Sequence, residues 1–313
     1  MAIMIDLVVI GKNSEDLLRK IYVEEYLSIL RKYINRLIYV DSRSSDQSIQ
    51  LMKDNGFDVC IVNEVELTAA AGRHVGTLVS QADYVLYLDS DMQLTNVDCF
   101  FNDFFDVVEN RKGIGCVGVV TDFFPNGTKK IRLRNNKQFD VASSFGGFVI
   151  LHRDSVIKAG NWNKNLFSNE EMDLYVRLQC QGGLVYYLTS SGVKHFTIVP
   201  SRLHSLLGVY LPLRKGRYGS LGKLLANQRS FCSTIKVINF HREVFLFISA
   251  VVFLFFSIYL FLIAIGILVV DVKKRKSLSY VAVVPGLAVS TVVCFLLEFM
   301  KKNKGKVVSY ENV

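Results

Sequence analysis

Short apolar runs alternate with segments of helical periodicity through the first 120 residues. The segments between the runs predict helices near 15–33, 45–55, 68–80 and 97–109. The runs themselves predict strands at Ile5–Ile10, Leu37–Val40, Phe57–Val62, Tyr84–Leu88 and Ile114–Val120. This alternation predicts an α/β fold, with a mostly parallel sheet covered by helices on both faces. Ligands of such sheets bind at the carboxyl ends of the strands, so residues there are the first candidates for chemistry.

The pattern changes after residue 120 but stays that of a folded domain. The features are a turn at Pro125–Thr128, a basic stretch at Lys129–Lys137, the pair Gly146-Gly147, a strand at Phe148–Leu151 and a helix beginning near Ser168. They extend the first predicted domain to residues 1–200.

Two long apolar segments follow in the C-terminal third. Residues 244–270 carry no charge, and as one helix they would reach about 40 Å, more than a hydrocarbon core of about 30 Å. Residues 278–297 form a second uncharged run, interrupted by Pro285. We expect two membrane segments within residues 243–300, with a pair of buried core helices as the alternative. Residues 201–242 predict basic amphipathic helices at the membrane surface, and residues 301–313 a basic tail.

The charge distribution supports a membrane partner and argues against nucleic acid. Residues 201–313 contain 16 Lys and Arg against four Asp and Glu, whereas residues 1–200 contain 21 against 24. The net charge of +9 therefore comes from the region around the apolar segments. The bias in Lys and Arg favours the cytoplasmic face of the inner membrane for both chain ends, although the basic loop at residues 273–276 conflicts with a simple hairpin. The six cysteines show no CxxC pair, as expected of reduced packing residues.

The most informative acids are Asp89 and Asp91, directly after the predicted strand Tyr84–Leu88. In an extended chain, residues i and i+2 point to the same side, so both carboxylates converge at the strand's carboxyl end. Paired carboxylates suit Mg²⁺ or Mn²⁺, with phosphate oxygens completing the shell. The alternative is a solvated turn in which Asp91 caps the helix near 97.

Two further acidic segments have structural alternatives. Asp41 ends the strand Leu37–Val40, while Ser44 and Gln47 fit a capping box for the next helix. Glu170, Glu171 and Asp173 lie at the start of the later helix. Ser168 with Glu171 fits a second capping box, and Asp173 with Arg177 an ion pair, but three acids within four residues exceed what capping requires.

Two basic side chains complete the set. His195 follows a strand-like segment and is a third metal ligand or a structural histidine. Arg73 lies in the helical stretch 68–80 and is expected either to face a diphosphate or to lie in solvent.

Six short motifs thus follow one another: Asn13, Asp41–Asp46, Arg73–Gly76, Asp89–Asp91, Gly146-Gly147 and Glu170–Leu174. In this order they resemble a family-2 glycosyltransferase with the GT-A fold over about residues 3–197. The resemblance implies an inverting transfer from a nucleotide-diphosphate sugar, usually linked to UDP, with Mn²⁺ or Mg²⁺ as cofactor. It also implies that residues 1–200 form the catalytic domain.

The resemblance also implies roles for individual residues. Asp41 matches the aspartate that contacts the nucleoside, and Asp89 and Asp91 match the pair that handles ribose, metal and diphosphate. Glu171 falls where the family has its catalytic Asp, so the base is one of Glu170, Glu171 and Asp173. Arg73 is expected to stabilise the leaving diphosphate, and Gly146 and Gly147 to let the backbone approach the sugar.

The apolar segments suggest that the acceptor is membrane-bound. We expect a polyprenyl-diphosphate-linked saccharide of bacterial surface-polysaccharide assembly, with other assembly enzymes as partners. A polyprenyl-phosphate glycosyltransferase is the second hypothesis. A catalytically inactive GT-A domain serving as a membrane scaffold is the third.

Overall fold

The structure is a computed structural model of the 313-residue chain. It describes residues 3–63, 67–132, 137–197, 220–226, 228, 231–254, 258–275, 284–285, 288–289, 291–293, 295 and 310–312. The chain divides into two compact units. The first comprises Met1–Asn165, Glu170–Val199 and Lys306–Val313, and the second comprises Leu166–Asn169 and Pro200–Gly305.

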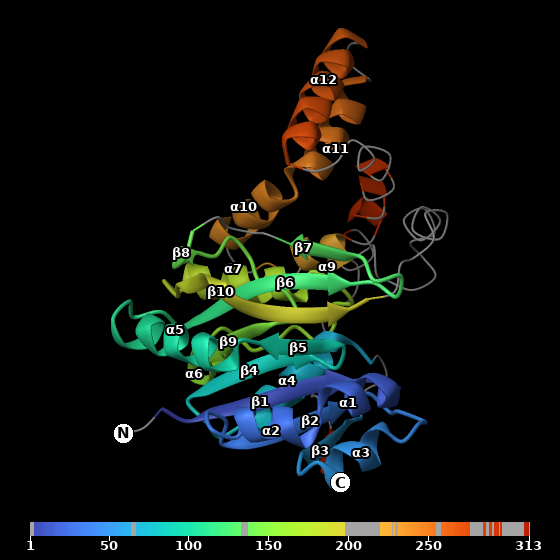
Figure 1. Ribbon diagram of the computed structural model, residues 1–313. Helices are drawn as coiled ribbons and strands as arrows, with labels where there is room; N and C mark the ends of the chain where they lie inside the picture. The colour runs from blue at the N-terminus through green and yellow to red at the C-terminus, as the bar shows by residue number, and fades with distance from the viewer. Residues whose placement is uncertain are drawn as a thin grey trace. The chain divides into compact units, whose positions relative to one another are not determined.

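The first unit is built on one mixed sheet with helices packed against it (Figure 1). The strand order is β11-β3-β2-β1-β4-β9-β6-β10-β5, with β7 paired to β6 and β8 to β10. The strands are β1 (Ile5–Gly11), β2 (Arg36–Asp41), β3 (Asp58–Val62), β4 (Tyr84–Asp89), β5 (Met92–Thr95), β6 (Gly115–Phe123), β7 (Lys129–Arg132), β8 (Asp140–Val141), β9 (Val149–His152), β10 (Val185–Phe196) and β11 (Tyr310–Asn312).

The helices of this unit are α1 (Glu15–Ile21), α2 (Glu24–Leu30), α3 (Ser48–Asp54), α4 (Ala69–Val79), α5 (Val97–Glu109), α6 (Arg153–Lys158) and α7 (Glu170–Cys180). The predicted helix 15–33 is thus two helices, α1 and α2, which end and begin on either side of Tyr22 and Val23. The α/β fold is confirmed. The expectation of a mostly parallel sheet is correct for β1 to β4, but the sheet is mixed beyond them: β9 pairs antiparallel with both β4 and β6, whereas β6 and β10 are again parallel.

Local sequence explains how α4, which carries Arg73, is positioned. The Thr68 side chain accepts a hydrogen bond from Ala71 N and caps the helix. A Cβ on Gly76 would lie 2.3 Å from Val8 Cγ1, so glycine lets α4 approach β1 closely. Apolar side chains such as Val8, Leu86 and Val75 are entirely buried between the helices and the sheet.

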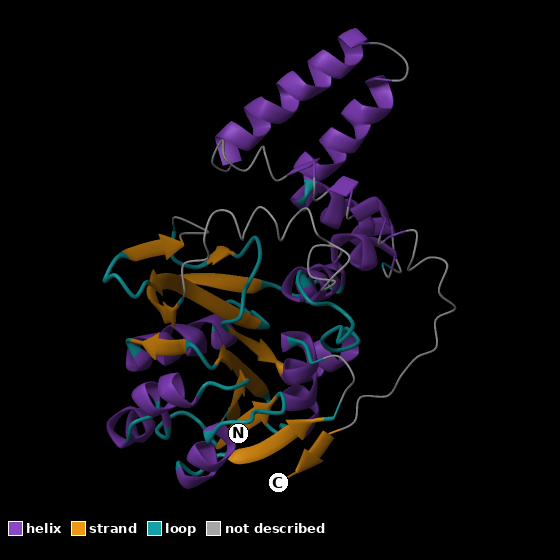
Figure 2. Cartoon of the chain, turned by 90° about the vertical axis from the view of Figure 1, so that its right-hand side faces the viewer, coloured by secondary structure: helices purple, strands orange, loops and turns teal. Residues whose placement is uncertain are grey.

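Apart from the short segment Leu166–Asn169, the described part of the second unit is mostly helical. It contains α9 (Ser220–Ala226), α10 (Phe231–Phe240), α11 (Arg242–Leu254) and α12 (Ile258–Arg275). The expectation of one helix over 244–270 is wrong, because α11 and α12 are separate helices that pack side by side (Figure 2). Most of the segment 278–297 lies outside the described residues. Among the helices that are described, none has the length and apolar character needed to cross a membrane.

The chain's C-terminal residues differ from the expected tail. Tyr310–Asn312 form β11, which pairs antiparallel with β3 at the edge of the sheet. The polypeptide therefore leaves the first unit before residue 200 and returns to it after residue 305.

Candidate active site

The candidate site lies where β4, β1, β2 and β10 reach their carboxyl ends. In the parallel register Asp89 lies opposite Ile10, and Asp41 opposite Gly11. After Asp89 the chain turns at once into β5, so Asp91 precedes a strand, and α5 has Asn96 as its N-cap. The alternative in which Asp91 caps that helix is therefore wrong. Phe196 N donates to Asp91 O at 2.9 Å, which ties the end of β10 to the acidic turn.

Arg73 is the centre of the first group of charged side chains. Its Nη2 lies 2.7 Å from Asp89 Oδ1, and its Nη1 lies 3.1 Å from Glu170 Oε1 and 3.7 Å from Glu171 Oε1. The guanidinium also lies 5.0 Å from the centroid of the Trp162 ring. The Arg73 side chain is only 1% exposed. The expected solvent position of Arg73 is wrong, because the side chain is buried and pairs with the site's own carboxylates. Its contact with a diphosphate stays a prediction.

The same cluster perturbs the acids around it. Burial raises the pKa of Glu171 to about 7, Glu170 and Asp89 add to the rise, and Arg73 opposes it only in part. Burial and the nearby Asp91 also raise the pKa of Asp89. Burial opposes the charge of Arg73, but the surrounding carboxylates raise its pKa above the ordinary value. Three acids thus share one cation, and the pKa of Glu171 is raised to near neutral pH.

Glu170, Glu171 and Asp173 are separated by their partners. Asp173 is buried and pairs with Arg177, as the i,i+4 spacing predicts. Glu170 is 6% exposed and accepts from Arg73, whereas Glu171 is 23% exposed and farther from the guanidinium. Of the three, Glu171 is therefore the carboxylate best placed to receive a proton from a ligand.

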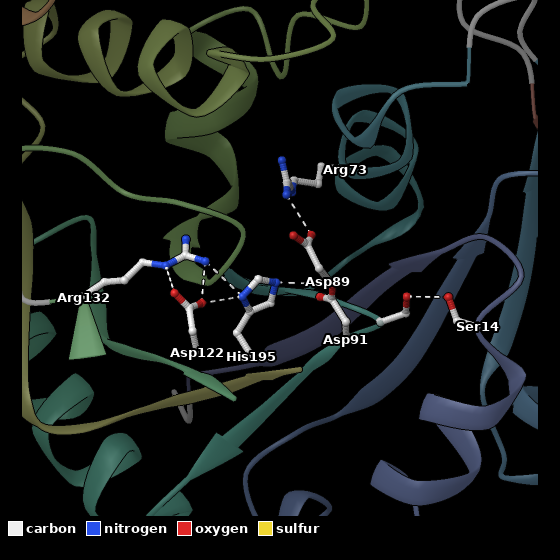
Figure 3. Close-up of polar contacts among 8 residues, drawn as sticks. Ser14, Arg73, Asp89, Asp91, Asp122, Arg132 and His195 are labelled. Carbon is white, nitrogen blue, oxygen red and sulfur yellow. Dashed lines mark hydrogen bonds and ion pairs between the residues drawn. The ribbon is translucent and has the colours of Figure 1, made fainter. Parts of the chain in front are cut away.

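His195 is the centre of the second group (Figure 3). Its Nε2 lies 3.3 Å from Asp91 Oδ2, and its Nδ1 lies 2.7 Å from Asp122 Oδ1. Arg132 pairs with both oxygens of Asp122 and also lies 3.0 Å from His195 Nδ1. The bond to Asp91 raises the pKa of His195, burial opposes this, and Asp122 adds to the rise. Burial alone would raise the pKa of Asp122, but its bonds with Arg132 and His195 lower it.

Asp91 and His195 fit a divalent cation that arrives with phosphate ligands. Asp91 Oδ1 is buried and has no hydrogen-bond partner among the described residues. Asp89 does not join this pair, because its carboxylate faces Arg73. Across the described part of the chain, no group of three or more His, Cys, Asp and Glu side chains is arranged to hold a metal ion. Mg²⁺ and Mn²⁺ sites built from one or two side chains and substrate phosphates are common, so two ligands suffice here.

Asp41 and the glycine pair have structural contacts in this arrangement. Asp41 is fully buried, and its two oxygens accept from the backbone N and the Oγ of Ser44. Ser44 Oγ also accepts from Asn13 N at 2.8 Å, which joins the loops after β1 and β2. Helix α3 begins at Ser48 with Gln47 as N-cap, so the capping box expected at Ser44 is wrong. The nucleoside contact of Asp41 stays a prediction.

Gly147 approaches a carboxylate of the protein. A Cβ at this position would lie 2.1 Å from Asp89 Oδ2. The glycine therefore lets the chain before β9 pack directly on Asp89. The approach to a sugar expected of Gly146 and Gly147 stays a prediction.

Several residues of the site were not found from the sequence. Asp122 and Arg132 hold His195, Trp162 packs on Arg73, and Ser90 bonds to Ser14 with 2.7 Å between their Oγ atoms. Asp122 could have been found from the rule that ligands bind at the carboxyl ends of strands, since it lies near the carboxyl end of the predicted strand Ile114–Val120. No sequence signal pairs it with a histidine 73 positions later.

Comparisons with known proteins find similarity in the fold, among solved structures. No protein-family model and no curated protein sequence matches the chain. Among solved structures, S. aureus TarS 1–349 in complex with UDP-GlcNAc aligns with TM-score 0.58 at 13% identity, over 96% of this chain and 93% of that one. The mannosyltransferase PcManGT from Pyrobaculum calidifontis, in complex with GDP-Man and Mn²⁺, aligns with TM-score 0.53 at 14% identity, over 93% and 86%.

A third structure is matched over part of its length. GalNAc-T7 with UDP, GalNAc and Mn²⁺ aligns with TM-score 0.51 at 15% identity. The match covers 77% of this chain, which spans about half of GalNAc-T7 (54%). The chain has the fold of the GT-A-like glycosyltransferases.

The Arg73 cluster leads to a prediction about stability. Arg73→Met leaves Asp89, Glu170 and Glu171 without their shared cation, and we expect it to lower the free energy of unfolding by on the order of 3–5 kcal/mol. The control is Arg36→Met, because the bridge from Arg36 to Asp58 lies at the surface and should contribute about 1 kcal/mol or less. Denaturant midpoints measure both. Equal losses in the two variants would contradict the central role of Arg73.

Proposed function

We propose that this protein is an inverting glycosyltransferase that moves a sugar from a nucleotide-diphosphate donor to a hydroxyl of a membrane-linked saccharide. The carrying observation is that Asp89, Asp91 and Glu171 converge at one edge of a GT-A-like sheet. A carboxylate with a pKa near 7 beside an acidic pair is the arrangement that proton abstraction next to an anionic leaving group requires. Neighbours of this fold were solved with UDP-GlcNAc and with GDP-Man, which supports a nucleotide sugar as donor.

In the proposed mechanism, Glu171 is the general base. It accepts the proton of the acceptor hydroxyl while the hydroxyl oxygen attacks the anomeric carbon. The bond from that carbon to the donor's diphosphate breaks in the same step, so the configuration at the anomeric carbon inverts. In this mechanism Glu170 and Arg73 take no part in the proton transfer from the acceptor hydroxyl. They hold Glu171 in place and leave it in a cluster that carries more negative than positive charge.

Asp91 and His195 would hold the metal, with Asp89 turned toward Arg73. A bound Mn²⁺ or Mg²⁺ supplies positive charge for the departing diphosphate. Two of the solved neighbours contain Mn²⁺, which supports a divalent metal for this protein.

The second unit supports an acceptor at the cytoplasmic face of the inner membrane. Large apolar side chains are exposed on its helices, at Phe231, Val252, Leu262, Ile263, Ile267 and Val270. Because the chain returns to the first unit as β11, a membrane-embedded second unit would enter and leave the bilayer on one side. Basic residues at 202–242 suit anionic lipids or a lipid diphosphate. Other polysaccharide-assembly enzymes would be partners at this surface.

Turnover with a defined donor tests the proposal. We expect purified protein in detergent, with Mn²⁺ and a lipid-linked saccharide extract, to release nucleotide from one of a panel of UDP-, GDP- and dTDP-sugars. EDTA and Asp91→Ala should each abolish release, since both remove the metal. Glu109→Ala, an exposed change at the end of α5, is the control. Faster release with bare polyprenyl phosphate would instead favour a polyprenyl-phosphate glycosyltransferase. Absence of donor binding in folded protein would favour a scaffold.

The raised pKa of Glu171 predicts a pH dependence of activity. Because the base must be ionised, we expect kcat/KM to rise with pH through about 7 and then level off. Glu171→Gln should lower kcat by about 10²- to 10⁴-fold and remove this ionisation from the profile. Initial rates between pH 5 and 9 measure it, with Glu109→Gln as the control. Full turnover by Glu171→Gln would exclude Glu171 as the base.

The same shift predicts an opposite effect on stability. The pKa of Glu171 is about 7 in the folded protein against an ordinary 4.5, so folding favours the protonated acid. The cost of ionised Glu171 is absent below the unfolded pKa, grows as pH rises to the folded value, and is constant above it. Glu171→Gln should therefore raise Tm at pH 8, and the gain should disappear as the pH approaches 4. A Tm gain that is the same at both pH values would contradict the assignment.

A further inference from the structure

The geometry around His195 is set by the sheet. His195 in β10 lies directly opposite Asp122 in the parallel β6 and opposite Met92 in the antiparallel β5. Arg132 reaches Asp122 from β7, which pairs antiparallel with β6. The imidazole is thus held between the acidic turn that contains Asp91 and a buried ion pair (Figure 3).

The contacts of Nδ1 compete for different protonation states of that nitrogen. Asp122 Oδ1, at 2.7 Å, accepts a hydrogen bond only from a protonated Nδ1. The Arg132 guanidinium, at 3.0 Å, donates only to an unprotonated Nδ1. A neutral imidazole carries one ring proton, so Asp122 and Arg132 favour opposite tautomers.

The tautomer of His195 determines whether Nε2 directs a lone pair or an N–H group toward Asp91. With the proton on Nδ1, Nε2 directs a lone pair toward Asp91 and is ready to bind a cation. With the proton on Nε2, the ring donates to Asp91 Oδ2, 3.3 Å away, and is blocked as a ligand. Metal-bound histidines generally donate their other N–H to a carboxylate, which fixes the ligating tautomer.

We propose that Asp122 and Arg132 act as an opposed pair of positioning residues, in which Asp122 stabilises the metal-ligating tautomer of His195 and Arg132 the non-ligating one. This inference rests on the proposed role of Asp91 and His195 as metal ligands.

The burial of the two residues fits these roles. The Asp122 side chain is 7% exposed and fixed between two partners, whereas the Arg132 side chain is 43% exposed. Because Arg132 is the more exposed of the two, it is the partner that can turn away from Nδ1, while Asp122 remains in place to accept the Nδ1 proton. The ability of His195 Nε2 to bind a metal therefore depends on the position of one exposed side chain, that of Arg132.

Mn²⁺ affinity tests the proposal without any donor or turnover. Free Mn²⁺ is measured by electron paramagnetic resonance at about pH 8.5, about two units above the ordinary pKa of histidine, because Asp91 and Asp122 raise the pKa of His195. Asp122→Asn should weaken Mn²⁺ binding about 10- to 100-fold, because its amide donates to Nδ1 and fixes the wrong tautomer. Arg132→Gln should strengthen binding severalfold. Asp122→Glu keeps a carboxylate that accepts from Nδ1, so its Mn²⁺ affinity should be close to that of the wild type. This variant also serves as the test if Asp122→Asn fails to fold.

A charge-matched control separates the tautomer from simple electrostatics. Removing any nearby positive charge would favour a cation, so Lys194→Gln is the comparison: Lys194 neighbours His195, and its ammonium lies over the Phe123 ring, 6.0 Å from the centroid. An equal gain in Lys194→Gln and Arg132→Gln would overturn the proposal. Weaker binding in Arg132→Gln would overturn it too.

Nitrogen-15 spectra of the metal-free protein report the tautomer directly, with the His195 signals assigned by their loss in His195→Gln. We expect both tautomers in the wild type, the Nε2–H form in Asp122→Asn, and a shift toward the Nδ1–H form in Arg132→Gln. Unchanged tautomers in all three proteins would overturn the proposal. Failure of the proposed glycosyl transfer would instead appear as absent turnover with these binding and tautomer responses intact.

Discussion

The candidate site depends on one buried cation, the guanidinium of Arg73. It joins Asp89 from β4 to Glu170 and Glu171 from α7, and it comes from α4, which packs on β1 and β2. The consecutive elements α4 and β4 therefore meet α7, which comes much later in the sequence, through a single side chain. A buried ion pair seldom adds net stability, but removal of one partner leaves an uncompensated buried charge. Arg73 thus fixes the relative position of the acids more than it stabilises the fold.

The backbone around Asp89 is adapted to the same cluster. Gly147 allows the chain to pass where any Cβ would overlap the Asp89 carboxylate. The strand that follows, β9, inserts antiparallel beside β4 and so ends the parallel half of the sheet. The change in sheet topology and the shielding of Asp89 therefore have one origin, the loop that leads into β9.

The sequence was most informative where periodicity and strand ends coincide. The strands that carry Asp41 and Asp89 were predicted to within one residue at each end, because buried parallel strands are continuous apolar runs. The roles of Arg73 and Asp122 could not be predicted, since both depend on contacts across the sheet that no local pattern encodes. Residues 244–270 were predicted as one helix because the length of an apolar run does not show where the chain reverses direction. The division into α11 and α12 places their apolar faces against each other.

The charge balance of the site connects its stability with its chemistry. Burial is the main cause that raises the pKa of Glu171 to about 7, and the negative charges of Glu170 and Asp89, which Arg73 offsets only in part, add to the rise. The same causes make the ligand-free fold less stable at high pH, because an ionised carboxylate in a buried acidic cluster is unfavourable. A ligand that brings a cation to Asp91 would relieve part of this repulsion, whereas a neutral ligand would not. The arrangement that suits Glu171 to its proposed role as a base therefore also favours a ligand that arrives with a cation.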